Sequence, residues 1–314
     1  MSTQSPRTRQ LAAASLLTCA VALPQAASAD FHFEGGLEVL SGEIRLGDVY
    51  SPDYTPPPTG SPDPGFPPTG TPPPTAPPPT SELSTEAEDY DGWAVSGTWY
   101  VGGVDTSRGP LRLAPFMSRA SSIGGRIGEI ETDSGVDADF YLLDTRWVLG
   151  NGVIIEADYG QADGGGGDAD IARVAGGYYF ADTSAVRLGY DSDDDDLADY
   201  ERWTVDVTHV QTMENGMTWS LSALFGFVTG DTAFGEGDDG NDLQLAGSFF
   251  PRDNFGFGFE VAFAERDATG DVDAYELWAD YFVTEKISLT LSYRDEDGDV
   301  VENDALNFEA RYRF

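Results

Sequence analysis

Few side chains in this sequence could act as a nucleophile, a general base or a metal ligand. The 314 residues include two histidines, His32 and His209, and one cysteine, Cys19. Acid–base catalysis needs a titrating side chain held against a partner, and nucleophilic catalysis needs a nucleophile beside its base. His209 continues the two-residue spacing of Trp203 and Val205, neither histidine has a carboxylate at a pairing position, and no Gly-x-Ser-x-Gly motif occurs. We therefore expect no catalytic residue and no enzyme.

Two acidic runs are the best candidates for binding a metal ion. The first is the four aspartates at residues 193–196, and the second extends from Asp295 to Glu302. The second run begins like a calcium loop, but Val300 stands where that loop needs glycine, and Glu302 comes too early for its last ligand. We expect weak, screened association of cations with solvated loops, with no dedicated metal site and no cofactor.

The charge of the chain is large and one-sided. There are 55 acidic residues against 17 lysines and arginines, the formal net charge is −38, and Lys286 is the only lysine. Such a surface repels nucleic acid and attracts cations, so we expect no nucleic-acid partner. Two explanations stay open: the protein works in salty surroundings, or divalent cations bridge its carboxylates to anionic lipopolysaccharide.

Most of the charged residues alternate with apolar ones. From residue 306 to the C-terminus, one set is Leu306, Phe308, Ala310, Tyr312 and Phe314, and the other is Asn307, Glu309, Arg311 and Arg313. Successive side chains of a strand point to opposite faces, so this segment has an apolar and a polar face. At least a dozen segments share the pattern, and with residues 31–50 as the first they make about 14 strands (roughly 12 to 16). The alternation slips near Gly42, which predicts a bulge there.

These strands predict an all-β transmembrane antiparallel barrel with lipid outside and a wet interior. No run of about 18 apolar residues could form a spanning helix. Short turns near residues 150, 182, 214, 252 and 285 alternate with longer acidic links at 131–137, 161–170, 191–199, 229–241, 265–273 and 295–304. Bacterial barrels have short periplasmic turns and longer extracellular loops, so this alternation places the C-terminus in the periplasm.

The N-terminal third has two further segments. Arg7 and Arg9 precede an apolar run at residues 11–23 and then Ala27-Ser28-Ala29, which predicts a signal peptide cleaved after residue 29. Residues 16–19 loosely resemble a lipoprotein cleavage box, but threonine before Cys19 is unfavourable. Residues 30–54 then form the first barrel strand or an N-terminal extension, residues 55–90 a proline-rich loop or linker, and residues 91–314 the barrel.

Charges on the polar faces should point into the barrel, because a basic residue facing lipid near mid-membrane costs about 2–4 kcal/mol. The predicted inward-facing set is Asp144, Arg146, Glu156, Asp158, Arg173, Arg187, Arg202, Asp206, Glu260, Glu276, Asp280, Glu309, Arg311 and Arg313. These residues either line a water-filled pore or form a salt-bridge network that closes the barrel. We favour the pore, because about 14 strands leave room for a narrow one.

A family resemblance enters at residues 109–123, where the sequence reads Gly109-Pro110-Leu111, then Ala114, Phe116 and Arg119-Ala120-Ser121-Ser122-Ile123. This stretch resembles the general porins of Gram-negative bacteria, and residues 93–101 and 312–314 look similar too. The resemblance covers residues 90–314 and implies passive diffusion of small hydrophilic solutes across the outer membrane. It also implies that Phe314 is the signal read by the barrel-assembly machinery. The proline-rich insertion, Arg112 and Pro115 depart from the pattern.

The expected function is therefore a porin-like outer-membrane channel that favours cations, because its loops and wall are acidic. The expected partners are outer-membrane lipid, lipopolysaccharide, the assembly machinery, small hydrophilic solutes and cations. Two alternatives remain: a non-conducting structural or adhesive barrel with acidic surface loops, and, more distantly, a secreted soluble β-sandwich. Whether copies of the chain form a homo-oligomer stays open.

Overall fold

The structure, a computed structural model, describes residues 30–46, 88–133, 135, 137–164, 167–195, 198–232, 237–267, 270–298 and 301–314. The predicted signal peptide and the proline-rich segment before residue 88 lie outside the described residues. Nearly all described residues belong to strands.

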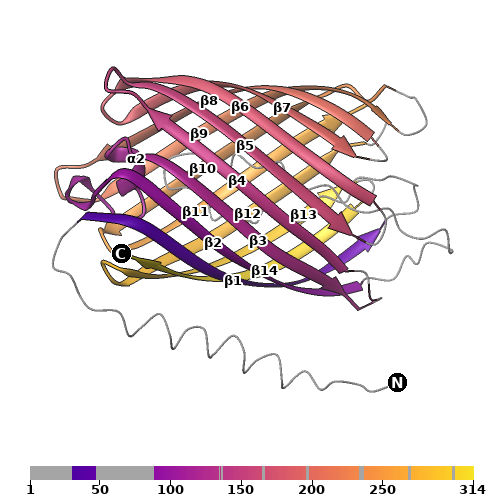
Figure 1. Ribbon diagram of the computed structural model, residues 1–314, viewed down its shortest axis with the longest axis horizontal. Helices are drawn as coiled ribbons and strands as arrows, with labels where there is room; N and C mark the ends of the chain where they lie inside the picture. Colours follow the sequence, from indigo (N-terminus) through magenta and orange to yellow (C-terminus); the bar gives the residue numbers. More distant parts are fainter. Residues whose placement is uncertain are drawn as a thin grey trace.

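Fourteen strands form one closed antiparallel barrel (Figure 1). The strands are β1 Asp30–Leu46, β2 Glu88–Asp105, β3 Ser121–Thr132, β4 Asp137–Val148, β5 Val153–Gly164, β6 Gly167–Ala181, β7 Ser184–Asp195, β8 Ala198–Thr212, β9 Thr218–Thr232, β10 Gly240–Arg252, β11 Phe255–Arg266, β12 Val272–Thr284, β13 Ile287–Gly298 and β14 Val301–Arg313. Each pairs with its neighbours in sequence, and β1 closes the ring against β14, where Leu37 lies opposite Ala310. The predicted fold is confirmed, including β3, which is the weakest strand signal in the sequence.

The outer face of the barrel is apolar, as the alternation predicts. Trp203, Leu221 and Leu277 each expose more than half of their surface (53%, 52% and 56%). A soluble protein with an apolar surface on every strand would aggregate, because exposed apolar patches beyond a few hundred Å² promote association. An apolar wall around a closed barrel is what a lipid bilayer solvates.

A charge on this wall should be costly at mid-strand and tolerated at the acidic strand ends. We expect Leu277→Arg to destabilise the barrel folded in liposomes by about 2–4 kcal/mol, because Leu277 lies halfway along the outer face of β12. Asp273→Arg, on the same face near the strand end, should cost about 0–1 kcal/mol. Urea titration of folding into liposomes measures both, and equal losses would show that residue 277 does not face lipid.

The predicted bulge near Gly42 is wrong. Strand β1 pairs with β14 in one register from Glu34 to Leu46, and its irregularity against β2 lies between Phe31 and Phe33. The alternation slips because the apolar residues change face, not because a residue is inserted. Leu40 is 1% exposed on the inner face, whereas Val39 on the outer face is 44% exposed.

The same exchange of faces occurs on β3. The sequence pattern groups Ile130 with Ile127, but Ile127 is exposed and Ile130 is buried inside the barrel with Tyr90 and Phe140. Beyond the lipid band the outer face of a strand meets water and becomes polar, so apolar side chains near that end pack inward.

Much of the predicted acidic links is strand. For example, β5 extends to Gly164 and β6 begins at Gly167, so the long link expected at residues 161–170 shortens to two residues. Strands can extend past the lipid with acidic side chains, because the backbone hydrogen bonds between strands do not require apolar side chains. The tight turn predicted at residues 150–152 is present, with Gly152 at φ 89°, a conformation that favours glycine.

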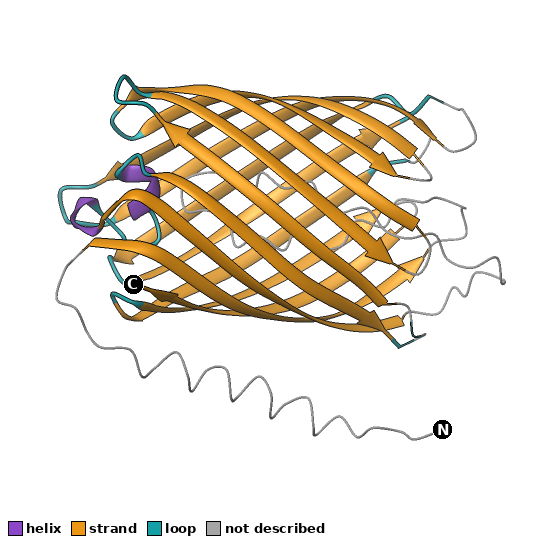
Figure 2. Ribbon diagram, in the orientation of Figure 1, coloured by secondary structure: helices purple, strands orange, loops and turns teal. Residues whose placement is uncertain are grey.

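The short turns, the C-terminus and two single-turn helices lie at one end, here called the short-turn end (Figure 2). The helices are η1 Thr106–Arg108 and α2 Ala114–Met117, both in the β2–β3 connection. Among the described residues, no helix is long and apolar enough to cross a membrane.

Candidate functional site

The structure places all fourteen predicted charged residues on the inner face of the barrel. Most are almost fully buried, and Asp144, Asp158, Arg202 and Arg311 are partly exposed. Whether this face lines a conducting pore stays a prediction. The packing instead shows how the charges are balanced, in three groups of ion pairs.

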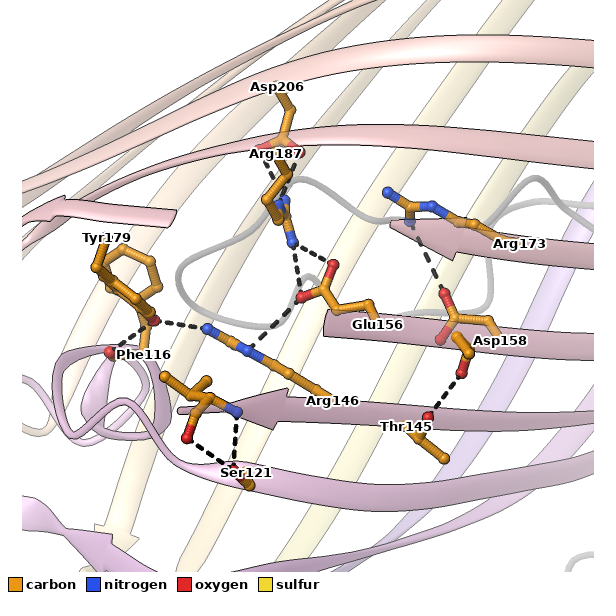
Figure 3. Close-up of polar contacts among 12 residues, drawn as sticks. Phe116, Ser121, Thr145, Arg146, Glu156, Asp158, Arg173, Tyr179, Arg187 and Asp206 are labelled. Carbon is orange, nitrogen blue, oxygen red and sulfur yellow. Dashed lines mark hydrogen bonds and ion pairs between the residues drawn. The ribbon is translucent and has the colours of Figure 1, made fainter. Parts of the chain in front are cut away.

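The first group crosses β4 to β8 and has Arg187 at its centre (Figure 3). Arg187 binds Asp206 through two nitrogens at 2.7 and 2.8 Å, and its third nitrogen lies 3.1 Å from Glu156. Arg146 lies 3.6 Å from Glu156 and donates to the Tyr179 hydroxyl at 2.6 Å. A two-nitrogen arginine–carboxylate contact fixes geometry as well as charge, so this group joins five strands of the wall.

The second group lies beside the first and crosses β5 to β10. Asp191 receives Arg173 at 3.0 Å and Arg202 at 2.8 Å. Arg173 also lies 3.9 Å from Asp158, and Arg202 lies 3.2 Å from Asp242. Positive and negative side chains thus alternate around this part of the wall.

The third group lies where the barrel closes. Arg311 binds Glu309 at 2.6 and 2.7 Å and Glu34 at 3.4 Å. Arg313 also binds Glu34, and Arg126 of β3 binds Glu38. These contacts connect β1, β3 and β14 through side chains in addition to the backbone ladder.

Sequence reasoning missed several members of these groups, namely Glu34, Glu38, Arg126, Asp191 and Asp242, and also the separate ion pair of Arg294 and Glu296 on β13. All except Glu296, which stands between two aspartates, have an outward apolar neighbour, as Glu38 has in Leu37 and Val39. Strict two-residue spacing carried to the strand ends would have found them.

The β2–β3 connection folds into the short-turn end of the lumen. We call residues 109–120 the inner segment. Its Leu113, Phe116 and Met117 are 1%, 0% and 8% exposed, and they share one apolar cluster with side chains of β5, β6, β7, β8, β10 and β12, namely Ile154, Tyr179, Ala185, Val210, Phe250 and Trp278. In the order of the ring, β5 and β12 lie on opposite sides of the barrel, so the cluster extends across the lumen.

Hydrogen bonds hold the inner segment from both sides. The Leu111 amide donates to the Asp253 carbonyl at 2.9 Å, and Arg313 donates to the Leu111 carbonyl at 3.0 Å. On the other side, the Tyr179 hydroxyl donates to the Phe116 carbonyl at 3.2 Å (Figure 3). A segment bonded to opposite walls constricts this end of the lumen.

Arg112 of the inner segment is 2% exposed and stacks on an aromatic ring. Its guanidinium lies 4.0 Å from the Trp278 ring centroid and 3.6 Å from the Asp280 carboxylate. Burial lowers the pKa of Arg112, and Asp280 is the main group that opposes this shift. Gly258 makes room for the indole, because a Cβ at this position would come within 2.5 Å of the Trp278 ring.

The inner segment was not predicted as part of the lumen. The signal that could have found it is the run Leu111–Met117, in which apolar residues do not alternate and Pro115 excludes a central strand position. Such a run needs burial on all sides. In a barrel whose outer face belongs to lipid, that burial is available inside.

A metal site, or an accessible nucleophile beside a base, would make the described residues reactive. No group of three or more His, Cys, Asp or Glu among the described residues could hold a metal ion, and residues 196, 299 and 300 of the acidic runs lie outside this set. His209 contacts the Ser184 hydroxyl at 2.7 Å, but Ser184 is 3% exposed. A nucleophile needs access to its substrate, so this pair does not resemble an active site.

Comparison with known proteins gives the family signal. Residues 80–221 match a family model described as "Putative general bacterial porin". The resemblance is therefore to porins. The matched residues include the inner segment together with strands β2 to β8. No curated protein sequence matches the chain.

Solved structures support the fold. Omp33, an outer-membrane protein of Acinetobacter baumannii, matches at TM-score 0.56 and 16% identity over 91% of this chain and 99% of its own. The KdgM porin in complex with oligogalacturonate (TM-score 0.41, 10% identity, 57% and 92% coverage) and OmpT of Vibrio cholerae (0.41, 12%, 92% and 99%) also match. At 16% identity the match to Omp33 shows a shared barrel fold.

Proposed function

We propose that this protein is a porin-like channel of the outer membrane for small hydrophilic solutes, with a preference for cations. The observation that carries the proposal is the division of polarity between the two faces of a closed 14-stranded barrel. Its outer face exposes apolar side chains, and its inner face is lined with charges. A barrel of this size has room for an interior path, whereas eight strands are filled by side chains.

The family signal supports a channel, and the orientation follows from its topology. We place the short-turn end in the periplasm and the acidic strand ends outside. Acidic residues at an entrance raise the local concentration of cations and exclude anions. An enzymatic role is not part of this proposal, because the described residues supply charge and shape rather than a reactive group.

One observation favours a non-conducting barrel. The inner segment packs across the short-turn end, and the ion-pair groups neutralise most of the wall. A barrel filled in this way would serve as a stable platform for its acidic exterior, in contact with cations and lipopolysaccharide.

Liposome swelling separates the two functions. Proteoliposomes of the folded protein in iso-osmotic arabinose should swell faster than empty liposomes, and swelling should slow as the sugar grows larger. Heat-modifiable migration on a gel would confirm folding in the same sample. Swelling that stays at the level of empty liposomes for folded protein would contradict the channel and favour the platform.

A further inference from the structure

Two inward-facing glutamates differ from their neighbours in how they are balanced. Arginines neutralise most carboxylates of the inner wall, namely Glu34, Glu38, Glu156, Asp158, Asp191, Asp206, Asp242, Asp280, Glu296 and Glu309. Among the described residues, Glu260 and Glu276 have no such ion pair. Both are buried, with 5% and 8% of their surface exposed.

The register of the sheet brings these two charges together. Glu260 of β11 lies directly opposite Glu276 of β12, and residues that face each other across antiparallel strands have Cβ atoms about 4.5–5.5 Å apart. Glu260 accepts a hydrogen bond from the neutral Gln244 side chain. Arg294 stands opposite Glu276 in the next strand pair, but its guanidinium binds Glu296 at 2.9 Å.

The pair also lies beside the constriction. Glu276 is two residues along β12 from Trp278, which packs against the inner segment, and four from Asp280. Asp280 is neutralised by Arg112 at 3.6 Å, and Arg112 also stacks on Trp278. On β12, Asp280 is therefore neutralised by Arg112 of the inner segment, whereas Glu276, four residues away, faces Glu260 without an arginine of the described strands in an ion pair.

We propose that Glu260 and Glu276 determine the cation preference of the lumen, a role that rests on the proposed channel function. Balanced ion pairs present little net field to a passing ion, whereas two neighbouring carboxylates without an ion-pair partner share at least one negative charge and present a negative field. Because they lie in a buried setting, their field is screened less than that of the acidic residues at the outer rim. The solutes they would favour are small cations such as K⁺ and organic ammonium ions.

Reversal potentials in planar bilayers test this assignment. We expect Glu260→Gln/Glu276→Gln to reduce the cation-to-anion permeability ratio in a KCl gradient by roughly two- to tenfold, the effect of one or two unit charges several Å from an ion in a water-filled lumen. Gln244→Lys should lower the ratio in the same direction by placing a cation beside Glu260, without removing a carboxylate. This second variant keeps the test decisive if the double variant folds poorly.

The matched control removes the same charge from outside the lumen. Glu265 lies on the outer face near the end of β11, and Glu285 lies in an exposed turn, so Glu265→Gln/Glu285→Gln should leave the ratio nearly unchanged. If the wild-type protein conducts but Glu260→Gln/Glu276→Gln leaves its permeability ratio unchanged, or the control variant lowers the ratio equally, the assignment is overturned and the channel function stands. Absence of wild-type conductance would instead overturn the channel, and the assignment with it.

Discussion

Replacing residues 110–119 by a short glycine–serine turn should raise the single-channel conductance several-fold. The inner segment packs its Leu113, Phe116 and Met117 against strands on opposite sides of the barrel. Without it, the short-turn end would have the width set by 14 strands alone, which is larger than a side-chain-filled barrel. Planar-bilayer recordings of the purified variant measure the change.

The same replacement should also lower stability. Burying each of the three apolar side chains contributes about 1.5–3 kcal/mol, so heat-modifiable migration is needed to confirm that the variant folds. The control replaces residues 214–216 of the exposed β8–β9 turn by glycine and serine, because this turn contributes no residue to the apolar cluster. A folded replacement variant with wild-type conductance would show that the inner segment is not the constriction.

A disulfide tests a separate point, namely whether the inner segment has to move for the channel to conduct. Leu111 and Asp253 are joined by a backbone hydrogen bond of 2.9 Å, which brings their backbones within the span of a disulfide. Leu111→Cys/Asp253→Cys should hold the inner segment in place. If conductance depends on movement of the segment, it should fall on oxidation and return on reduction.

The second large effect is expected at Arg187. Arg187→Met should destabilise the barrel by about 3–5 kcal/mol, because removing one partner of a buried ion pair leaves the other charge uncompensated. Arg187 is 2% exposed and binds both Asp206 and Glu156, which are themselves 2% and 7% exposed. Urea unfolding in detergent micelles, followed by tryptophan fluorescence, measures the loss.

Two comparisons identify the cause of that loss. Arg252→Met changes an exposed arginine at the end of β10 and should cost less than about 0.5 kcal/mol. Arg187→Met/Asp206→Asn removes the carboxylate left without its arginine and keeps Glu156, which Arg146 still balances at 3.6 Å, so it should recover much of the stability. A single variant as stable as the control would mean that this ion-pair group does not hold the strands together.

The barrel could be predicted from sequence because one periodicity encodes it. Apolar residues such as Leu277 and Phe308 alternate with inward charges such as Glu276 and Glu309, and the alternation decides both the fold and the side to which each residue points. Where a strand leaves the lipid band, its apolar residues lie on the inner face and its polar residues on the outer face. This is why Leu40 and Ile130 point inward and why a false bulge was predicted near Gly42.

Pairing between distant residues could not be predicted in the same way. Sequence gives the face of Arg187 and Glu156, but their 3.1 Å contact depends on strand register and on rotamers fixed by the neighbours. The inner segment was missed for a related reason. Its side chains are buried by six different strands, and no local pattern around Leu113 or Phe116 records those partners.

The central claim is that this barrel conducts ions and favours cations. It is tested most directly by recording the folded wild-type protein in a planar bilayer under a tenfold KCl gradient. We predict discrete conductance steps and a reversal potential displaced toward the K⁺ equilibrium potential. The absence of steps from protein that is demonstrably folded, or a reversal potential displaced toward that of Cl⁻, would contradict the claim.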